Sequence, residues 1–294
     1  MSALIKAQII GAYGRQYQAE QADGKIITCL TRGKKSDVAC GDFVDILPIA
    51  DNQGVIEAIQ PRASLLYRSD AYRQKMIAAN VSQIIVVVAS EPPFSDDLLA
   101  RCLIAAVDQK IEVLIVLNKC DLVDKAAASR QLLAPYGKIG YRILELSATQ
   151  DAASLLPLLH GHTSVLVGQS GMGKSTIINS LIPDAQVATR EISIALNSGK
   201  HTTTHARLYH VNADSKLIDC PGVQMFGLYH LSLGEIEQGF IEFTPYLGKC
   251  RFHNCSHTHE PNCALQQGVI DCKIDARRFK LFQLISAEHQ PTKY

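Results

Sequence analysis

The sequence has no excess of charge of either sign, no long apolar run and no targeting leader. Its 29 basic and 28 acidic residues give a formal net charge of +1, so the overall charge does not indicate a nucleic-acid partner, and any basic surface must be local. Apolar runs such as residues 84–89 are far shorter than the ~20 residues that a membrane-spanning helix needs. We therefore expect a cytoplasmic protein with no membrane partner.

The cysteines do not form an even set that would suggest a disulfide framework. There are nine, and four of them are concentrated at positions 250, 255, 263 and 272. In a reducing compartment such a cluster indicates a metal before disulfides. The chain has 294 residues, of which 47% are hydrophobic and 19% charged, so it can bury a core and form two or three domains.

One stretch, residues 164–179, organises the rest of the chain. It contains an apolar run, the pattern G-x-x-x-x-G-K-S and an amphipathic helical run, which is the order of strand, loop and helix in a phosphate-binding P-loop. The alternative is a glycine-rich turn before an ordinary helix. In a P-loop the glycines let successive N–H groups converge on an anion. Lys174 is then expected to reach the β- and γ-phosphates, and the Ser175 hydroxyl to ligate Mg²⁺. The predicted nucleotide contacts are Gly168, Gln169, Ser170, Gly171, Met172, Gly173, Lys174, Ser175 and Thr176.

A second polar motif, Asn118-Lys119-Cys120-Asp121, follows a buried strand predicted at residues 112–117. Ligands of open α/β sheets bind at the carboxyl ends of strands. The Asp121 carboxylate can accept hydrogen bonds from N1–H and the exocyclic amine of guanine, a donor pair that adenine lacks. The Lys119 stem can cover the base, and Asn118 can tie this loop to the P-loop. Alone, the motif could equally be a polar turn.

A short box, Ser147-Ala148-Thr149, follows a further predicted strand at residues 141–146. We expect N–H groups of Ser147 and Ala148 to contact the guanine carbonyl. Buried strands at 82–89 and 112–117, separated by a helix at 96–108 that Ser95 caps, predict an α/β nucleotide-binding domain.

Two segments after the P-loop complete the predicted site. Residues 198–204 suit a mobile loop with a threonine for Mg²⁺ and the γ-phosphate; among Thr202, Thr203 and Thr204 we choose Thr203. His201 is a candidate catalytic or water-positioning group, although a solvated loop histidine is the commoner case.

The second of these segments, Asp219-Cys220-Pro221-Gly222, ends a predicted strand. Asp219 should hold the Mg²⁺ shell, and the Gly222 N–H should sense the γ-phosphate. Val223 stands where many GTPases have the glutamine that orients the attacking water, so slow hydrolysis by the isolated chain is expected.

Residues 1–66 contain short β-rich runs separated by glycines, which predicts a small barrel, most simply an OB-fold. The sequence Arg32-Gly33-Lys34-Lys35 would be a basic loop on it for RNA, or equally a solvated hairpin tip. Residues 61–79 are polar and suit a connector with a short helix.

Near the end of the chain, Cys250, Cys255, His257 and Cys263 form the pattern C-x4-C-x-H-x5-C. Three thiolates and one imidazole close a tetrahedral zinc shell, so the site would be structural rather than catalytic. His253, His259 and Cys272 are nearby substitutes as ligands. The predicted helix at 274–287 then carries Arg277, Arg278 and Lys280, either as a phosphate-contacting face or as solvated charge.

In ordinary small GTPases the phosphate loop precedes the base loop, whereas here residues 118–121 precede residues 168–175. Permutation keeps such a site intact, because it joins termini that lie close together. The combination resembles the ribosome small subunit-dependent GTPase A family, circularly permuted GTPases of late 30S maturation. The resemblance rests on the barrel, residues 76–81, both nucleotide motifs, residues 199–204, the D-x-P-G motif and the cysteine cluster.

This resemblance implies an α/β fold in three parts: an OB-fold barrel (1–66), a permuted P-loop GTPase domain (67–230) and a zinc-binding α-helical domain (231–294). It selects Cys250, Cys255, His257 and Cys263 as ligands of a structural Zn²⁺. It implies a monomer that binds GTP and GDP, and GTP hydrolysis stimulated by the 30S subunit, with 16S rRNA as the main contact.

The sequence departs from the family pattern in two ways: it lacks the long basic N-terminal extension that some members carry, and residues 147–151 lack the glycine that often follows the Ser147-Ala148-Thr149 box. Three alternatives remain: an ATPase, an RNA-binding assembly factor with a vestigial nucleotide site, and a permuted GTPase acting on the large subunit.

Overall fold

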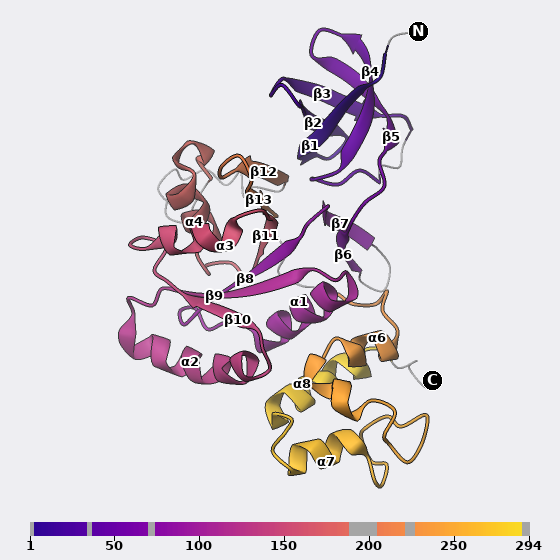
Figure 1. The fold of residues 1–294 in the computed structure, drawn as a ribbon, viewed down its shortest axis with the longest axis vertical. Coiled ribbons are helices and arrows are strands. Elements are labelled where there is room, and N and C mark those ends of the chain that lie inside the picture. The colour runs from indigo at the N-terminus through magenta and orange to yellow at the C-terminus, as the bar shows by residue number, and fades with distance from the viewer. Residues whose placement is uncertain (1–2, 34–36, 70–73, 188–204, 221–226, 290–294) are drawn as a thin grey trace.

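The computed structural model describes residues 3–33, 37–69, 74–187, 205–220 and 227–289. A barrel, a central α/β domain and a helical region follow one another along the chain (Figure 1). One sheet of eleven strands runs through the first two parts, in the order β10-β9-β8-β11-β13-β12-β1-β2-β3-β5-β4.

The barrel is built from five short strands and confirms the predicted fold of this part. They are β1 (Ile5–Tyr13), β2 (Gln16–Gln21), β3 (Ile26–Thr31), β4 (Phe43–Ala50) and β5 (Gln53–Ile59). An antiparallel pairing of β1 with β4 closes the barrel, which gives the strand order of an OB-fold. Alternate residues such as Ile9, Ile27 and Ile46 point inward and form its core.

A hairpin joins the barrel to the central domain, where the sequence had suggested a connector with a short helix. That prediction was wrong: β6 (Leu65–Ser69) and β7 (Gln74–Ala79) pair antiparallel. The polar composition hides a few buried apolar positions, among them Leu66 and Ile77. Ala79 N donates to Cys40 O at 2.8 Å, so the hairpin is also tied to the barrel.

The central domain has a mostly parallel sheet covered on both faces. Its strands are β8 (Gln83–Ala89), β9 (Glu112–Asn118), β10 (Arg142–Glu145), β11 (Thr163–Val167), β12 (Ala206–His210) and β13 (Lys216–Asp219). Only β12, among the described strands of this domain, runs antiparallel to its neighbour. Every residue of β8 is buried, because helices pack on both of its faces.

Two layers of helices enclose this sheet (Figure 1). One face carries α1 (Asp96–Asp108) and α2 (Val123–Lys138), and the other carries α3 (Leu156–Leu159) and α4 (Lys174–Leu181), with the short turns η1 (Ala152–Leu155) and η2 (Pro183–Ala185). The Ser95 hydroxyl accepts from Leu98 N at 3.2 Å, which confirms the predicted cap of α1.

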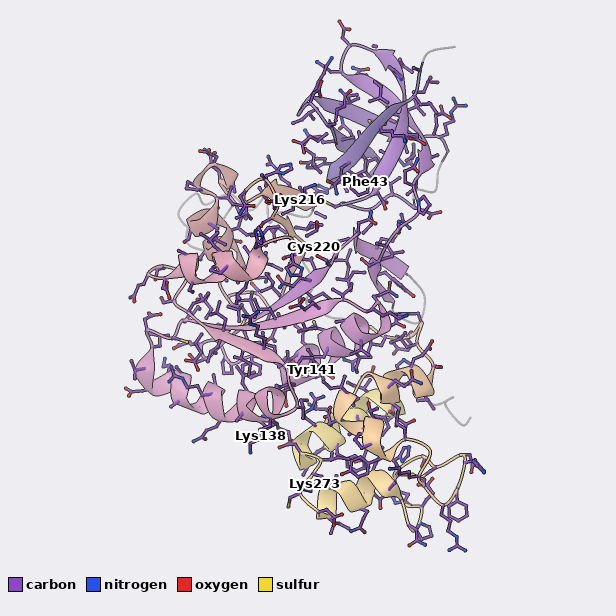
Figure 2. The ribbon with its side chains drawn as sticks, in the orientation of Figure 1. Phe43, Lys138, Tyr141, Lys216, Cys220 and Lys273 are labelled. Carbon is purple, nitrogen blue, oxygen red and sulfur yellow. The ribbon has the colours of Figure 1, made fainter. Side chains whose placement is uncertain are left out.

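The helical region consists of α6 (Leu233–Gln238), η3 (Ile241–Tyr246), α7 (Ala264–Ile270) and α8 (Ala276–Ala287). Its aromatic core, which includes Phe240 and Phe282, is continuous with the core that α1 forms under the sheet. Figure 2 shows Tyr141, just after α2, beside this region. In the described part of the chain, no helix has the length and apolar character to cross a bilayer.

The predicted basic face of the helix at 274–287 is not present as such. Arg278 is 1% exposed and its guanidinium is paired with Glu242. Arg277 is paired with Asp96 at 3.1 Å and also donates to Leu132 O. Only Lys280 of the three is exposed. The two arginines hold the helical region against the central domain and are not available as a phosphate-binding face.

Candidate nucleotide and metal sites

The P-loop lies at the carboxyl end of β11, between β8 and β13, and leads into α4. Two of its glycines are required by close neighbours. A Cβ on Gly168, whose φ is +148°, would lie 2.3 Å from Val87 O. A Cβ on Gly173, whose φ is +95°, would lie 2.2 Å from Asn118 Nδ2. The conformation of the loop is thus constrained by the neighbouring strand β8 and by residues 118–121, the predicted guanine-binding motif, here called the base motif.

Asn118 joins three loops that are far apart in the sequence. Its Nδ2 donates to Met172 O at 2.8 Å, and its Oδ1 accepts from Lys119 N at 2.8 Å and from Ala148 N at 2.9 Å. The side chain is 2% exposed. The expected tie between the base motif and the P-loop is therefore present, and it extends to the Ser147 box. Because the Ala148 N–H is used here, its expected contact with guanine would have to be shared with Asn118.

Lys174 begins α4 and folds back over the P-loop. Its Nζ donates to Gly168 O at 2.6 Å and to Gln169 O at 2.8 Å. Burial lowers the pKa of this ammonium, and the nearby Asp219 carboxylate offsets part of that effect. A half-buried ammonium whose hydrogen bonds go to backbone carbonyls is well suited to an incoming phosphate.

Asp219 is the last residue of β13 and lies opposite Leu166, the residue before the last of β11. Burial raises the pKa of its carboxyl, while the Lys174 cation lowers it in part. The structure therefore brings a buried carboxylate near a half-buried ammonium, and Ser175 follows Lys174 in the first turn of α4. Carboxylate and hydroxyl oxygens are ligands that Mg²⁺ accepts, alongside phosphate oxygens.

The remaining predicted base contacts lie on the exposed side of this site. Asp121 and Cys120 follow Lys119, whose Nζ donates to Glu91 O at 2.6 Å. Sequence reasoning missed this contribution of the segment between β8 and α1. The same segment reaches the P-loop, because Ser95 N donates to Gln169 Oε1 at 2.7 Å. The Ser95 cap was visible in the sequence, but its link to Gln169 depends on the fold.

Several predicted residues lie outside the described part of the chain. They are His201, Thr202, Thr203, Thr204, Gly222 and Val223 at the nucleotide site, and Lys34 and Lys35 on the barrel.

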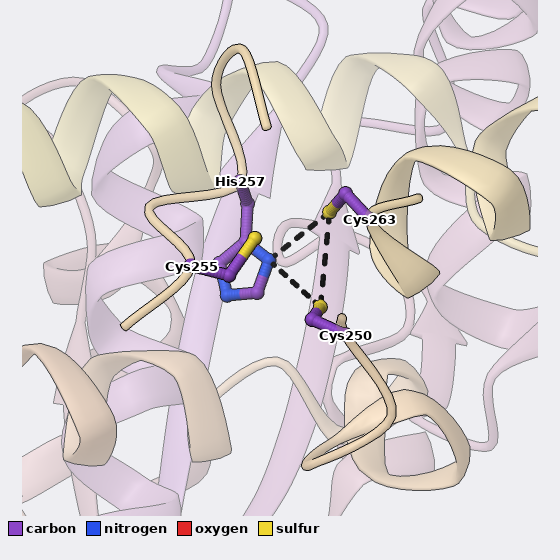
Figure 3. A group of neighbouring side chains, drawn as sticks. All are labelled: Cys250, Cys255, His257 and Cys263. Carbon is purple, nitrogen blue, oxygen red and sulfur yellow. Dashed lines mark hydrogen bonds between the residues drawn. The ribbon is translucent and has the colours of Figure 1, made fainter. Parts of the chain in front are cut away.

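The helical region brings together all four predicted metal ligands (Figure 3). The ligand atoms of Cys250, Cys255, His257 and Cys263 lie within 4.8 Å of one another. The sulfurs of Cys250 and Cys263 are 3.9 Å apart, and His257 Nδ1 is 3.6 Å and 3.2 Å from them. Zn–S bonds of about 2.3 Å in a tetrahedron place two sulfurs about 3.8 Å apart, so this donor set fits zinc.

The nearby candidates His253, His259 and Cys272 lie outside this group of four. Sequence reasoning also missed a residue of the site, Glu237 in α6. Its Oε1 lies 2.9 Å from His257 Nε2 and accepts that N–H. Nδ1 is directed at the thiols, and a carboxylate on the other ring nitrogen is the usual support of a metal-binding histidine.

A family model described as RsgA GTPase matches residues 59–229, which span the hairpin and the central domain. The chain belongs to this family.

Relatives match this RsgA family member over nearly its whole length. A protein named small ribosomal subunit biogenesis GTPase RsgA from Nitrosospira multiformis is 51% identical over 283 residues, covering 96% of this chain and 90% of the relative. One of the same name from Burkholderia pseudomallei is 50% identical over 291 residues, covering 97% and 93%.

Two solved structures resemble the chain as a whole. The crystal structure of YjeQ from Thermotoga maritima has a TM-score of 0.76 at 26% identity and covers 99% of this chain and 100% of its own. That of YloQ, described as a circularly permuted GTPase, has a TM-score of 0.72 at 25% identity and covers 99% and 97%. The chain is therefore a GTPase whose G domain is circularly permuted, as its motif order indicates.

Proposed function

We propose that this GTPase acts in the biogenesis of the small ribosomal subunit, where hydrolysis of GTP drives its release from the maturing particle. The supporting observation is the position of Asn118, whose three hydrogen bonds hold the base motif, the P-loop and the Ser147 box as one unit. A single nucleotide can span these loops. The names of the relatives given above support the small subunit as the place of action.

On the base side, Asp121 would accept the two guanine donors and the Lys119 stem would cover the ring. On the phosphate side, the Lys174 ammonium would exchange its two carbonyl partners for phosphate oxygens, which are stronger acceptors. Ser175 and Asp219 would hold Mg²⁺, which neutralises developing phosphate charge. Thr203, Gly222 and the candidate His201 complete the proposed set.

The cysteine and histidine group would hold a structural Zn²⁺. All four positions of a tetrahedral shell are filled by side chains, which leaves no open position for substrate. We further propose that the protein is a cytoplasmic monomer whose contacts on the subunit are mainly with 16S rRNA.

A change at the phosphate end of the site has a direct route to the barrel. Asp219 ends β13, β13 pairs with β12, and β12 pairs in turn with β1 of the barrel. Loss of the γ-phosphate would therefore change the grip on RNA through this strand path.

Turnover of GTP by the zinc-loaded, full-length protein tests the proposal, measured alone, with purified 30S subunits and with 50S subunits. We expect slow turnover alone and strong stimulation by 30S subunits; activators of other GTPases supply up to about 10⁵-fold. Stimulation by 50S subunits alone would favour action on the large subunit, and no response to either would refute the proposal.

Nucleotide preference is tested separately with Asp121→Asn, which should shift preference from guanine to xanthine nucleotides. The matched control is Asp124→Asn, an exposed carboxylate in the first turn of α2, which should keep guanine specificity. Retained guanine preference in Asp121→Asn would show that the base lies elsewhere.

A further inference from the structure

Residues 249–254, which include Cys250 and end just before Cys255, form a short and mostly exposed turn. Its backbone is fixed at both ends. Arg251 N donates to Asn262 O at 3.4 Å, and Cys255 N donates to Phe252 O at 3.2 Å. The turn lies in the stretch before α7, which extends to the edge of the molecule (Figure 1). Its side chains are therefore presented on a fixed frame before any partner arrives.

Phe252 is 41% exposed in this turn. The other phenylalanines of the helical region form its core, where they pack against one another: Phe240, Phe243, Phe279 and Phe282. The core is thus complete without Phe252. A single exposed apolar side chain needs no explanation by itself, so its neighbours decide what it is suited to bind.

Those neighbours are cationic or polar. The guanidinium carbon of Arg251 lies 5.5 Å from the Phe252 ring centroid. The turn also contains Lys249, His253 and Asn254, and it contains no acidic residue. Within the described ranges, neither Lys249 nor Arg251 forms an ion pair. An exposed ring is therefore combined with two cations that have no protein counter-charge.

We propose that the 249–254 turn binds an unpaired nucleotide of RNA, with the base stacked on Phe252 and Arg251 and a neighbouring phosphate on Lys249. Unpaired bases can stack on aromatic rings and guanidinium planes, whereas the base faces within an A-form helix are already stacked and inaccessible. A protein partner would match an exposed ring with further apolar surface, and here the surroundings are charged. The ribosomal origin of the RNA rests on the proposed function, while the stacking chemistry does not.

Fluorescence anisotropy tests the proposal with the zinc-loaded, full-length protein and two labelled RNAs, a single-stranded 12-mer and a duplex of the same length. Phe252→Ala and Phe252→Leu should each weaken binding of the single strand about 10-fold, because stacking on an aromatic ring is lost. Phe252→Tyr keeps the ring and should bind as the wild type does. The matched control is Ile270→Ala in α7, an exposed apolar residue of the same region at 72% exposure, which should change nothing.

Zinc content is measured for every variant. If Phe252→Ala loses zinc, the RNA affinities of Phe252→Leu and Phe252→Tyr are compared instead, which shows whether binding requires an aromatic ring. Unchanged single-strand binding by Phe252→Ala overturns the inference, as does full affinity in Phe252→Leu, which would indicate an apolar contact of the kind that proteins make. Co-sedimentation with 30S subunits separates the two proposals. If the wild-type protein does not bind 30S subunits, but its binding of single-stranded RNA depends on Phe252, the proposed function is refuted and the proposal for the turn stands.

Discussion

The barrel and the helical region are attached to the same central domain in different ways. The barrel is joined edge to edge: β1 pairs with β12 at Gly11 and Ala12, and polar contacts such as Lys216 Nζ to Gln8 Oε1 at 2.7 Å flank the pairing (Figure 2). The helical region instead shares its apolar core with α1 and α2. Few side chains contribute to the joint between the barrel and the central domain, whereas many contribute to the joint between the helical region and the central domain. We therefore expect the barrel to move more easily than the helical region.

The second joint is further reinforced by buried charge. Arg278 is paired with Glu242, and its guanidinium carbon lies 4.6 Å from the Tyr136 ring of α2 and 5.0 Å from Phe240. Arg101 of α1 bonds to both Asp97 and Glu288. The contacts that cross the joint are therefore those of Arg278 with Tyr136 and of Arg101 with Glu288, and removing a partner of the buried pair inside the helical region would leave an uncompensated charge beside it.

The largest expected effect is loss of the metal. Cys255→Ser removes one of four ligands, and residues 247–263 contain no helix or strand that would hold the region together without it. We expect loss of bound zinc and unfolding of the helical region, a cost of several kcal/mol, while the barrel stays folded. Hydrogen exchange and zinc content measure both. Cys272→Ser, an exposed cysteine outside the group, should leave both unchanged.

Arg278→Ala should have the next largest effect. It leaves Glu242 buried without a partner, which typically costs about 3–5 kcal/mol. Urea unfolding monitored by fluorescence measures the change. Lys280→Ala, on the exposed side of the same helix, is the matched control and should stay within about 0.5 kcal/mol. Equal effects of the two substitutions would show that neither the buried pair with Glu242 nor the contact of Arg278 with Tyr136 contributes to the stability of this joint.

Asp219→Asn tests the candidate nucleotide site in the central domain, to which both the barrel and the helical region are joined. Since burial raises the pKa of this carboxyl in the folded state, the group favours the native state below its unfolded pKa, and this contribution is lost as pH rises through the folded pKa. At neutral pH the nucleotide-free variant should therefore be more stable than the wild type, because it has no buried charge at this position. It should also lose stabilisation by GTP with Mg²⁺. Thermal melts from about pH 4, the ordinary pKa of an aspartate, up to neutral pH measure this; a variant that is no more stable than the wild type at neutral pH contradicts it.

The smallest effect is expected at the barrel joint. His210 Nε2 lies 2.6 Å from Glu20 Oε2 across this joint, and the two side chains are partly exposed. Such pairs contribute about 0–1 kcal/mol, so His210→Ala should barely change the midpoint of urea unfolding. A loss comparable with that of Arg278→Ala would reverse the comparison between the two joints.

The sequence indicated where the loops of the candidate nucleotide site lie, because its motifs are local. A P-loop and the Asn118 motif have fixed spacings and follow buried apolar strands, so both residue types and places could be inferred. The metal ligands were predicted for a similar reason, although choosing among the extra cysteine and histidines needed the family resemblance.

What the sequence did not predict depends on partners far along the chain. Arg278 looked like part of a basic face because nothing local indicates Glu242, which lies 36 residues earlier. Glu237 reads as an ordinary charge on a short helix until the fold places it against His257. The stretch that forms the β6–β7 hairpin carries several basic residues, which hid two short apolar strands whose buried side chains include Leu66 and Ile77. In each case tertiary packing decided the outcome over local preference.

The pairing of β1 with β12 also protects the central sheet from self-association. A strand at the margin of a sheet exposes unpaired N–H and C=O groups, which readily recruit a strand from another molecule. In this chain β12 is the outermost strand of the central domain on that side, and the barrel covers part of it. A truncated protein that lacks β1 to β5 would expose the unpaired edge of β12, and its tendency to form oligomers or aggregates would rise.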